Sequence, residues 1–178
     1  MLKVTMEALG LTLRPVDRTD AGRLLAWRNA PEVVAWSETG AVDPAQHEAW
    51  LGRTLANPDC HFRIAEFRDQ AIGWRRVDVQ GLAGTVSILI DLRWQRMGYG
   101  WLLLDQAILW AAQSGLTELL ARIHVANLAS RRLFGGHGFR PIRQEGLWLT
   151  YQQTLSAPPN TPYLLPMEGQ YDVGYLNP

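Results

Sequence analysis

The sequence contains little cysteine, no long apolar run and no excess of charge of either sign. Cys60 is the only cysteine in 178 residues, so no disulfide forms within the chain and a reducing cytoplasm is expected. No apolar run approaches the ~18 residues of a membrane-spanning helix, and no basic-then-apolar signal pattern opens the sequence. Basic and acidic residues number 17 each, which argues against a general nucleic-acid binder. These absences predict a cytoplasmic protein with neither membrane nor nucleic-acid partners.

What is present indicates one folded domain with an ordinary core. Hydrophobic residues make up 47% of the sequence, and the length suffices for a single domain. The eight tryptophans are expected to lie mostly in that core, because an indole ring buries a large apolar area, with one or two lining a ligand groove. Cys60 follows a turn-like Asn57-Pro58-Asp59 stretch and is interpreted as a structural thiol rather than a nucleophile. No metal site is predicted.

Hydrophobic periodicity divides the chain into strand and helix segments. Strands are predicted over residues 11–16, 61–67, 71–79, 85–92, 119–125, 139–142 and 147–155. Helices are predicted from an N-cap at Thr19 or Asp20 to Arg28, over 32–36, from Asp43 to Asn57, over 98–114 and over 128–136. This order predicts one α+β domain around a mixed sheet over residues 1–155. An extended, proline-containing tail over 156–178 is expected to pack on the body or on a second subunit, so a monomer and a homodimer both stay open.

The most informative stretch is the turn between the strand that ends near Leu92 and the long helix that follows. Gly98 and Gly100 lack Cβ atoms, so the backbone there can approach a ligand closely. The free N–H groups and the dipole of a helix start attract anions. The turn is therefore suited to a phosphate or pyrophosphate, although two spaced glycines alone are also typical of an ordinary turn into a helix.

The same turn resembles the signature of a known enzyme family. Gln95-Arg96-Met97-Gly98-Tyr99-Gly100 matches the Q/R-x-x-G-x-G/A pattern of the GNAT superfamily, between the fourth strand and the next helix as in that family. The stretch from Asn127 to Phe139 resembles the family's second region, N-x-x-S/A-x-x-L-Y/F-x-x-x-G-F. The element order from Leu11 to Leu155 agrees. The resemblance implies an N-acetyltransferase with a mixed, mostly antiparallel sheet flanked by helices, whose splayed central strands hold acetyl-CoA.

The resemblance also implies which residues hold the cofactor. Backbone N–H groups from Arg96 to Trp101 would bind the pyrophosphate, and the strand edge at Ile88–Ile90 would pair with the pantetheine arm. Asn127 and Ser130 would contact the pantetheine, and Phe134 would face the thiol. The complete predicted cofactor set is Ile88, Leu89, Ile90, Gln95, Arg96, Met97, Gly98, Tyr99, Gly100, Trp101, Asn127, Ser130 and Phe134.

The catalytic groups are less clearly marked. Many family members carry a tyrosine acid at the position of Phe134, which cannot donate a proton. A thiol pKa of about 8.5 would allow the thiolate to leave unaided. His124, late in a strand beside the cofactor gap, and Glu38 are the candidate bases, with Asp91 and Glu66 as alternatives. A bound water chain could replace any single base.

Trp27-Arg28-Asn29-Ala30-Pro31-Glu32-Val33 resembles a W-R-N-x-P-E-V pattern of one GNAT branch. That branch holds ribosomal-protein N-terminal acetyltransferases and nucleotide-linked amino-sugar N-acetyltransferases, such as the pseudaminic-acid pathway enzyme. The family builds its acceptor site largely from the first helices. The predicted acceptor contacts are therefore Arg28, Asn29, Trp36, Ser37, Glu38 and His47.

A nucleotide-linked amino sugar is the preferred acceptor on sequence grounds. Its diphosphate could meet Arg28, Arg75 and Arg76, and its base could stack on a tryptophan. A peptide N-terminus is the alternative amine, which Glu38 would attract. A third hypothesis is a non-catalytic module that binds acyl-CoA. It stays open because phenylalanine, not tyrosine, occupies position 134.

Overall fold

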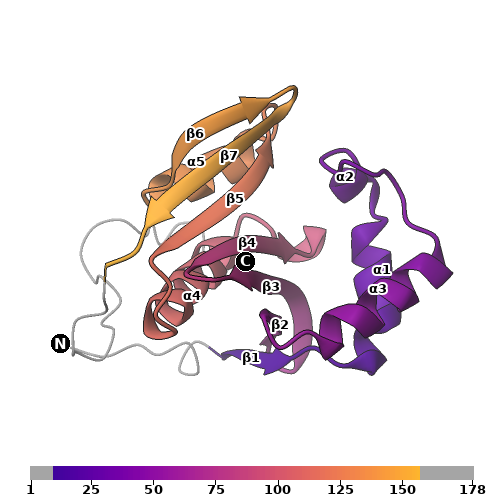
Figure 1. Cartoon of the computed structure of the whole chain (residues 1–178). Coiled ribbons are helices and arrows are strands. Elements are labelled where there is room, and N and C mark those ends of the chain that lie inside the picture. Colours follow the sequence, from indigo (N-terminus) through magenta and orange to yellow (C-terminus); the bar gives the residue numbers. More distant parts are fainter. Residues whose placement is uncertain (1–9, 157–178) are drawn as a thin grey trace.

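The computed structural model describes residues 10–156, which form one α+β unit (Figure 1). Its strands are β1 (Leu11–Pro15), β2 (Cys60–Phe67), β3 (Gln70–Gln80), β4 (Ala83–Ile90), β5 (Glu118–His124), β6 (Arg140–Glu145) and β7 (Trp148–Thr154). Its helices are α1 (Ala21–Arg28), α2 (Pro31–Val34), α3 (Pro44–Ala56), α4 (Tyr99–Gln113) and α5 (Leu128–Gly136), with short 3-10 turns η2 (Arg18–Asp20) and η3 (Leu92–Trp94). Of the predicted C-terminal tail, only Ser156 belongs to the described residues.

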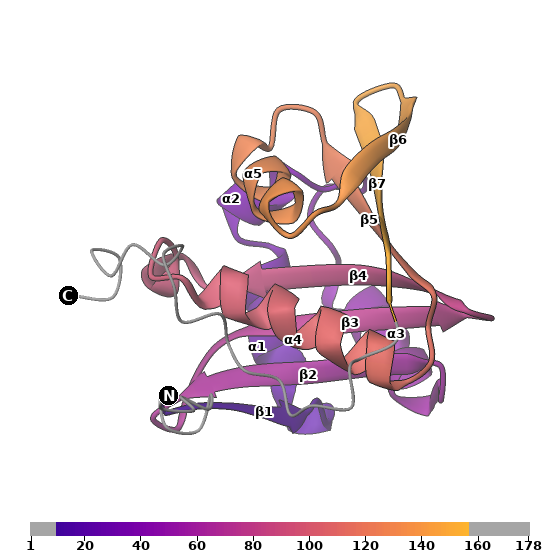
Figure 2. The ribbon, with the colours of Figure 1, turned by 90° about the vertical axis from the view of Figure 1, so that its left-hand side faces the viewer.

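The strands form one seven-stranded sheet in the order β1-β2-β3-β4-β5-β7-β6. Every neighbouring pair is antiparallel except β4 and β5, which run parallel. That parallel pairing is confined to Ala83–Thr85 on β4 and Glu118–Leu120 on β5. Beyond it the two strands diverge, and Figures 1 and 2 show β5, β7 and β6 leaning away from β1–β4. The predicted mixed sheet with splayed central strands is confirmed.

Two layers of helices cover the sheet. On one face α4 buries Leu104 and Ala107 against Val86, Leu119 and the other members of the largest apolar cluster. On the opposite face α1 and α3 pack through a second cluster that includes Leu24 and Leu51. Burying each such leucine contributes about 1.5–3 kcal/mol. No helix in the described part of the chain is long and apolar enough to cross a membrane.

Asp20 is the N-cap of α1, one of the two residues predicted for it, although its side chain makes no cap bond to that helix. Asp17 caps the preceding η2 turn by accepting from the Thr19 N–H at 2.7 Å. The Asp20 carboxylate accepts from Nη1 and Nη2 of Arg14, both at 2.7 Å, and from the Asp17 N–H at 3.1 Å, which completes the capping box of η2. Asp43 does cap α3, where it accepts from the Ala45 N–H at 2.8 Å.

Most tryptophans pack on the core, as expected. Trp27 is buried at 8% exposure, and the half-buried Trp50, Trp74, Trp94 and Trp110 pack against the apolar clusters. Trp36 is exposed at 40%, and Trp101 and Trp148 are half-buried. An indole ring combines a large apolar face with a polar N–H, so partial burial suits it. Cys60 is half-buried, and burial raises the pKa of its thiol to about 11, which makes it a poor nucleophile at neutral pH.

Candidate active site

The predicted pyrophosphate turn joins β4 to α4 at the open end of the splayed strands. Gly98 is the N-cap of α4 with φ 81° and ψ −8°, and Arg96 also has a positive φ of 64°. Glycine adopts this left-handed geometry without strain. The Gly98 carbonyl accepts from Trp101 and Leu102, at 3.0 and 3.2 Å. The N–H groups of Tyr99 and Gly100 come before these first bonds of the helix, so they form an anion-binding end.

Gly100 tests whether this turn suits a ligand. A Cβ built there would lie 3.5 Å from Leu133 Cδ2 and 3.8 Å from Ile90 Cγ1, which are ordinary contacts. Packing within the chain therefore does not require glycine at this position. A molecule lying against the backbone would require it, and this observation fits a bound pyrophosphate.

The turn and the cofactor strand are joined directly. The Gln95 side chain donates from Nε2 to the Ile90 carbonyl at 3.0 Å, so it shapes the turn. On its other edge β4 pairs with β3 through Gly73–Arg75 opposite Ile88–Ile90. Because β5 has diverged at this level, the Ile88–Ile90 edge faces the gap, as the cofactor prediction requires.

The α5 residues of the predicted set lie across the gap from this edge. Asn127 caps α5 by accepting from the Ser130 N–H at 3.1 Å. Phe134 is buried at 4% exposure, and its ring meets Phe139 edge to face at 5.1 Å. Phe134 is thus a core residue. Its correspondence to the family's tyrosine position and its contact with a thiol stay predictions.

An aromatic group covers the open end of β5. His124, the last residue of β5, lies 5.5 Å from Trp36 and 5.3 Å from Trp148, measured between ring centroids. Glu38 forms a 2.6 Å ion pair with Arg122, whose guanidinium also lies 5.7 Å from the Trp148 ring. The structure therefore brings together three predicted site residues, from the loop after α2 and from β5, and adds two that the sequence did not reveal.

Two other predicted acceptor residues, Arg28 and Asn29, form hydrogen bonds that hold the loop after α2 in place. Asn29 exchanges two 2.8 Å hydrogen bonds with the Val42 backbone, which uses both ends of its amide. The Arg28 guanidinium donates to Ser37 Oγ at 2.6 Å. His47 is 4% exposed and packs on Trp50, 5.2 Å between ring centroids, away from the aromatic group. Their direct contact with an acceptor stays a prediction, whereas their role in shaping the loop is visible.

The proton-transfer candidates differ in their surroundings. Arg93 and, after it, the Trp27 N–H bond hold the pKa of Asp91 well below its usual range, which makes this carboxylate a weak base. Glu66 accepts from Arg14 Nε at 2.7 Å on the outer strands. His124 Nδ1 accepts from the Ala126 N–H at 3.2 Å, so a neutral ring carries its proton on Nε2.

Two arginines that the sequence suggested for an acceptor diphosphate are placed elsewhere. Arg75 is 4% exposed and contacts His61, which stacks on Trp110 of α4, on the far face of the sheet. Arg76 is bound to Asp78 at 2.7 Å. Because side chains alternate along β3, the Arg75 side chain lies on the α4 face of the sheet, opposite the face that packs on α1 and α3. The sequence alone did not predict on which face it lies. Arg122 lies at the aromatic group instead.

A pocket of about 320 Å³ lies between α1, α2 and the end of β4. Its lining residues are Arg23, Ala26, Trp27, Ala30, Glu32, Val33, Leu89, Ile90, Asp91, Leu92, Arg93 and Gln95. The pocket reaches the cofactor strand and the start of the pyrophosphate turn. Arg23 was missed at the sequence level, since a charged residue on a surface helix carries no distinguishing signal, and Glu32 was noted only as part of the W-R-N-x-P-E-V resemblance.

Comparison with known proteins identifies this arrangement. A family profile described as "Acetyltransferase (GNAT) domain" matches residues 10–140. The chain belongs to the GNAT acetyltransferase family. Its enzyme class is thus acetyltransferase, and the predicted fold, enzyme class and acetyl-CoA cofactor are confirmed. No curated protein sequence matches the chain significantly.

Solved structures show the same GNAT fold at low sequence identity. Spermidine N-acetyltransferase from Vibrio cholerae, in complex with CoA and spermine, has a TM-score of 0.75 and 16% identity, covering 83% of this chain and 97% of that one. An acetyltransferase from Salmonella typhimurium with acetyl-CoA has a TM-score of 0.66 and 20% identity, covering 83% and 95%. A domain from Methanocaldococcus jannaschii has a TM-score of 0.74 and 19% identity, covering 82% and 98%.

Proposed function

We propose that this GNAT enzyme transfers the acetyl group of acetyl-CoA to the primary amine of a nucleotide-linked amino sugar. The observation that carries the proposal is the divergence of β4 and β5, with an anion-binding helix start on one side and the Trp36–His124–Trp148 aromatic group on the other. A thioester donor with a pyrophosphate fits the first side. An acceptor that combines an amine, an aromatic base and phosphates fits the second.

Bound acetyl-CoA supplies an activated acetyl group. The first-turn N–H groups of α4 hold the pyrophosphate, and their partial positive charge needs no reorganisation when the anion arrives. The backbone edge at Ile88–Ile90 orients the pantetheine, and donors from this edge stabilise negative charge that develops on the carbonyl oxygen. Holding both reactants in place supplies much of the rate enhancement.

His124 is the proposed base. Its half-buried ring lies at the end of β5, between Trp36 and Trp148. To accept a proton at Nε2 the ring gives up the Ala126 bond and moves its own proton to Nδ1. Phe134 offers no acid, so the thiolate leaves without a proton from that position.

The charge at the aromatic group favours the amino sugar over a cationic acceptor. Glu38 is neutralised by Arg122, so the pair adds no net negative charge that would draw a peptide N-terminus or a polyamine. Arg122 is 48% exposed and can exchange its carboxylate partner for a phosphate, as a guanidinium binds both. Trp36, 40% exposed, offers a face for stacking a base. The W-R-N-x-P-E-V branch that residues 27–33 resemble holds enzymes for both amino sugars and protein N-termini, so the charge at the aromatic group decides between these two acceptors.

The test compares initial rates with UDP-linked amino sugars, peptides with free N-termini and polyamines at saturating acetyl-CoA. We expect the nucleotide sugar to give the highest kcat/KM. Arg122→Gln should raise KM for the nucleotide sugar about 10-fold, the loss of a charge-assisted hydrogen bond, and leave the affinity for acetyl-CoA unchanged. His124→Gln should lower kcat by about 100-fold.

Preference for a peptide, with Glu38→Gln raising its KM, would replace the amino sugar by a protein N-terminus. Tight acetyl-CoA binding without turnover of any amine would favour the non-catalytic module.

A further inference from the structure

The sheet face that packs on α4 carries a basic cluster, consisting of His61, Arg63 and Arg75, which acetyl transfer does not use. Arg63 on β2 is directly opposite Arg75 on β3. His61 is two residues from Arg63 and therefore shares this face. The His61 ring stacks on Trp110 of α4, with 3.9 Å between centroids and 8° between planes. The basic cluster thus borders the second half of α4.

The basic cluster has no counter-ion among residues 10–156. Arg75 is 4% exposed and donates to His61 Nδ1 at 3.1 Å, and its Nε is buried without an acceptor. The ion pairs within that part of the chain involve neither Arg63 nor Arg75. A guanidinium stays charged, and like charges directly opposite each other on two strands are destabilising. An anion bound here would offset both effects.

The titration of the cluster agrees with this picture. Burial, and after it the charge of Arg63, lowers the pKa of Arg75 to about 10. Burial and the two arginines lower the pKa of His61 to about 3. Both lowered pKa values mean that the protonated, positively charged form is disfavoured, as expected for a poorly hydrated cationic site.

We propose that a carboxylate from the C-terminal segment of this chain, residues 157–178, binds the basic cluster, so that this segment docks on the sheet beside α4. The segment contains Glu168 and Asp172 and no lysine, arginine or histidine. It is also rich in tyrosine and leucine, which suits Leu13 of β1 and Phe67 of β2, partly buried apolar side chains that pack against Ala65 and Leu103. Its charge is thus complementary to that of the cluster.

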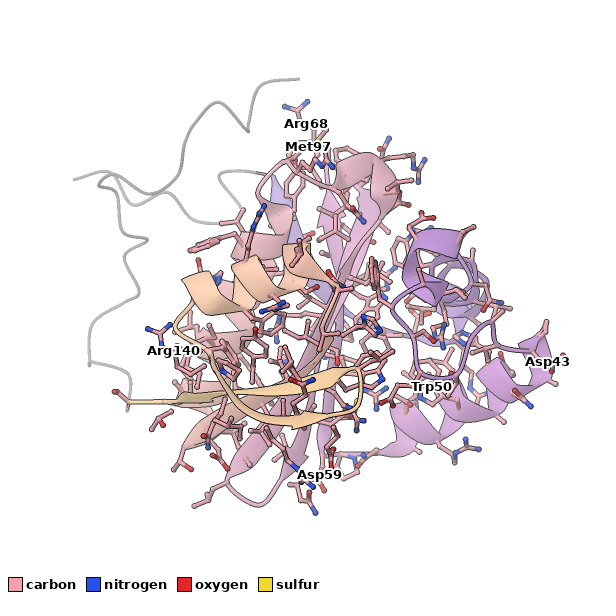
Figure 3. The ribbon with its side chains drawn as sticks, turned by 90° about the horizontal axis from the view of Figure 1, so that it is seen from above. Asp43, Trp50, Asp59, Arg68, Met97 and Arg140 are labelled. Atoms are coloured by element: carbon pink, nitrogen blue, oxygen red, sulfur yellow. The ribbon has the colours of Figure 1, made fainter. Side chains whose placement is uncertain are left out.

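The strand register brings the start of this segment to the correct end of the sheet. Thr154 pairs with Glu118, Glu118 with Ala83, and Ala83 with Gln80, while the Val79 N–H donates to the Asp59 carbonyl. The end of β7 is therefore level with the start of β2, about four strand spacings or ~19 Å away. Figure 3 shows Asp59 at this end, opposite Arg68 and Met97.

Both acids can reach the cluster. Glu168 follows Thr154 by 14 residues (168 − 154), which span up to about 46 Å when extended. In Figure 2, α4 runs obliquely over the middle of the sheet and its C-terminal end reaches the start of β2, whereas β1 lies beside the helix. The N-terminal residues are a poorer source, because β1 places Leu11 opposite Phe67 and Pro15 opposite Arg63.

The experiment is a double-mutant cycle measured by thermal unfolding of the full chain. Arg63→Gln is combined with the double variant Glu168→Gln/Asp172→Asn. In the parent we expect Arg63→Gln to lower Tm by roughly 3 °C, because an ion pair is lost. In the variant without acids it should leave Tm unchanged or raise it, since it then relieves only the repulsion from Arg75. The matched control Arg53→Gln, an exposed arginine of α3, should shift Tm equally in both backgrounds.

The single changes Glu168→Gln and Asp172→Asn identify which carboxylate couples to Arg63. Hydrogen exchange supplies a second readout that does not depend on the substitution at Arg63. Amides of residues 60–67 should exchange faster when the chain is cut back to 156. An equal effect of Arg63→Gln in both backgrounds, or unchanged exchange after truncation, would overturn the proposal. So would a full chain that sediments as a dimer and becomes monomeric on truncation, because the carboxylate would then come from a second copy.

Discussion

Replacing Gly98 tests the cofactor site through charge alone. Gly98 has φ 81°, which Asn and Asp tolerate better than other residues with a Cβ, so both substitutions introduce similar strain. We expect about 1 kcal/mol of destabilisation in each, or a Tm lower by roughly 3 °C. The two side chains have the same shape and differ by one negative charge. Gly98→Asn is therefore the matched control for Gly98→Asp.

The magnitude follows from the position of the new carboxylate at the helix start. A carboxylate about 5 Å from one phosphate charge, at an effective dielectric constant of about 20, raises the energy by about 3 kcal/mol. Gly98→Asp should therefore bind CoA ~150-fold more weakly than Gly98→Asn in calorimetric titration, and added salt should narrow the difference. Affinities of the two variants that agree within about threefold would refute the assignment of this turn to the pyrophosphate.

Three further predictions concern the core, the half-buried His61 and a rejected base. Leu104→Ala, at a fully buried position of the α4 face, should lower stability by about 3 kcal/mol in denaturant titration, whereas Leu82→Ala at 64% exposure should change it by less than about 0.5 kcal/mol. Because burial and two arginines lower the pKa of His61 to about 3, the unfolded chain takes up its proton first as pH falls. The free energy of unfolding is therefore highest above about pH 6.5 and falls toward pH 4. This loss should be about 2 kcal/mol larger in the parent than in His61→Gln, a value already reduced because the ring is partly exposed. Parallel curves of stability against pH would contradict this. Asp91→Asn should keep kcat within about threefold while lowering stability by about 1 kcal/mol through the weakened Arg93 and Trp27 bonds, and loss of turnover would restore Asp91 as the base.

The sequence predicted the order of elements because each segment has a clear period. The alternation from His61 to Leu92 yielded the β2–β4 meander, and the apolar stripe of α4 yielded its helix to within about two residues at either end. The proline after Asp43 marked the start of α3. Local signals of this kind do not depend on distant residues.

The sequence could not predict features that depend on contacts between distant segments. Asp20 stands at a predicted N-cap position of α1, but its carboxylate binds Arg14 of β1, a contact that a local capping rule does not reveal. The face of Arg75 follows from the irregular register between β2 and β3, near Ala65 and Glu66. Arg122 is recognisable as a site residue only when the loop after α2 places Glu38 beside it.

The gap between β4 and β5 is proposed to bind acetyl-CoA and to place its acetyl group beside an amine. Release of free thiol from acetyl-CoA, followed with the amine panel, tests this proposal, and mass spectrometry then identifies the acetylated product. We predict thiol release that depends on the acceptor, highest with a nucleotide-linked amino sugar, and an acetyl group on its nitrogen. Thiol release that is the same with and without any amine, or none with any acceptor despite tight acetyl-CoA binding, would contradict acetyl transfer by this site.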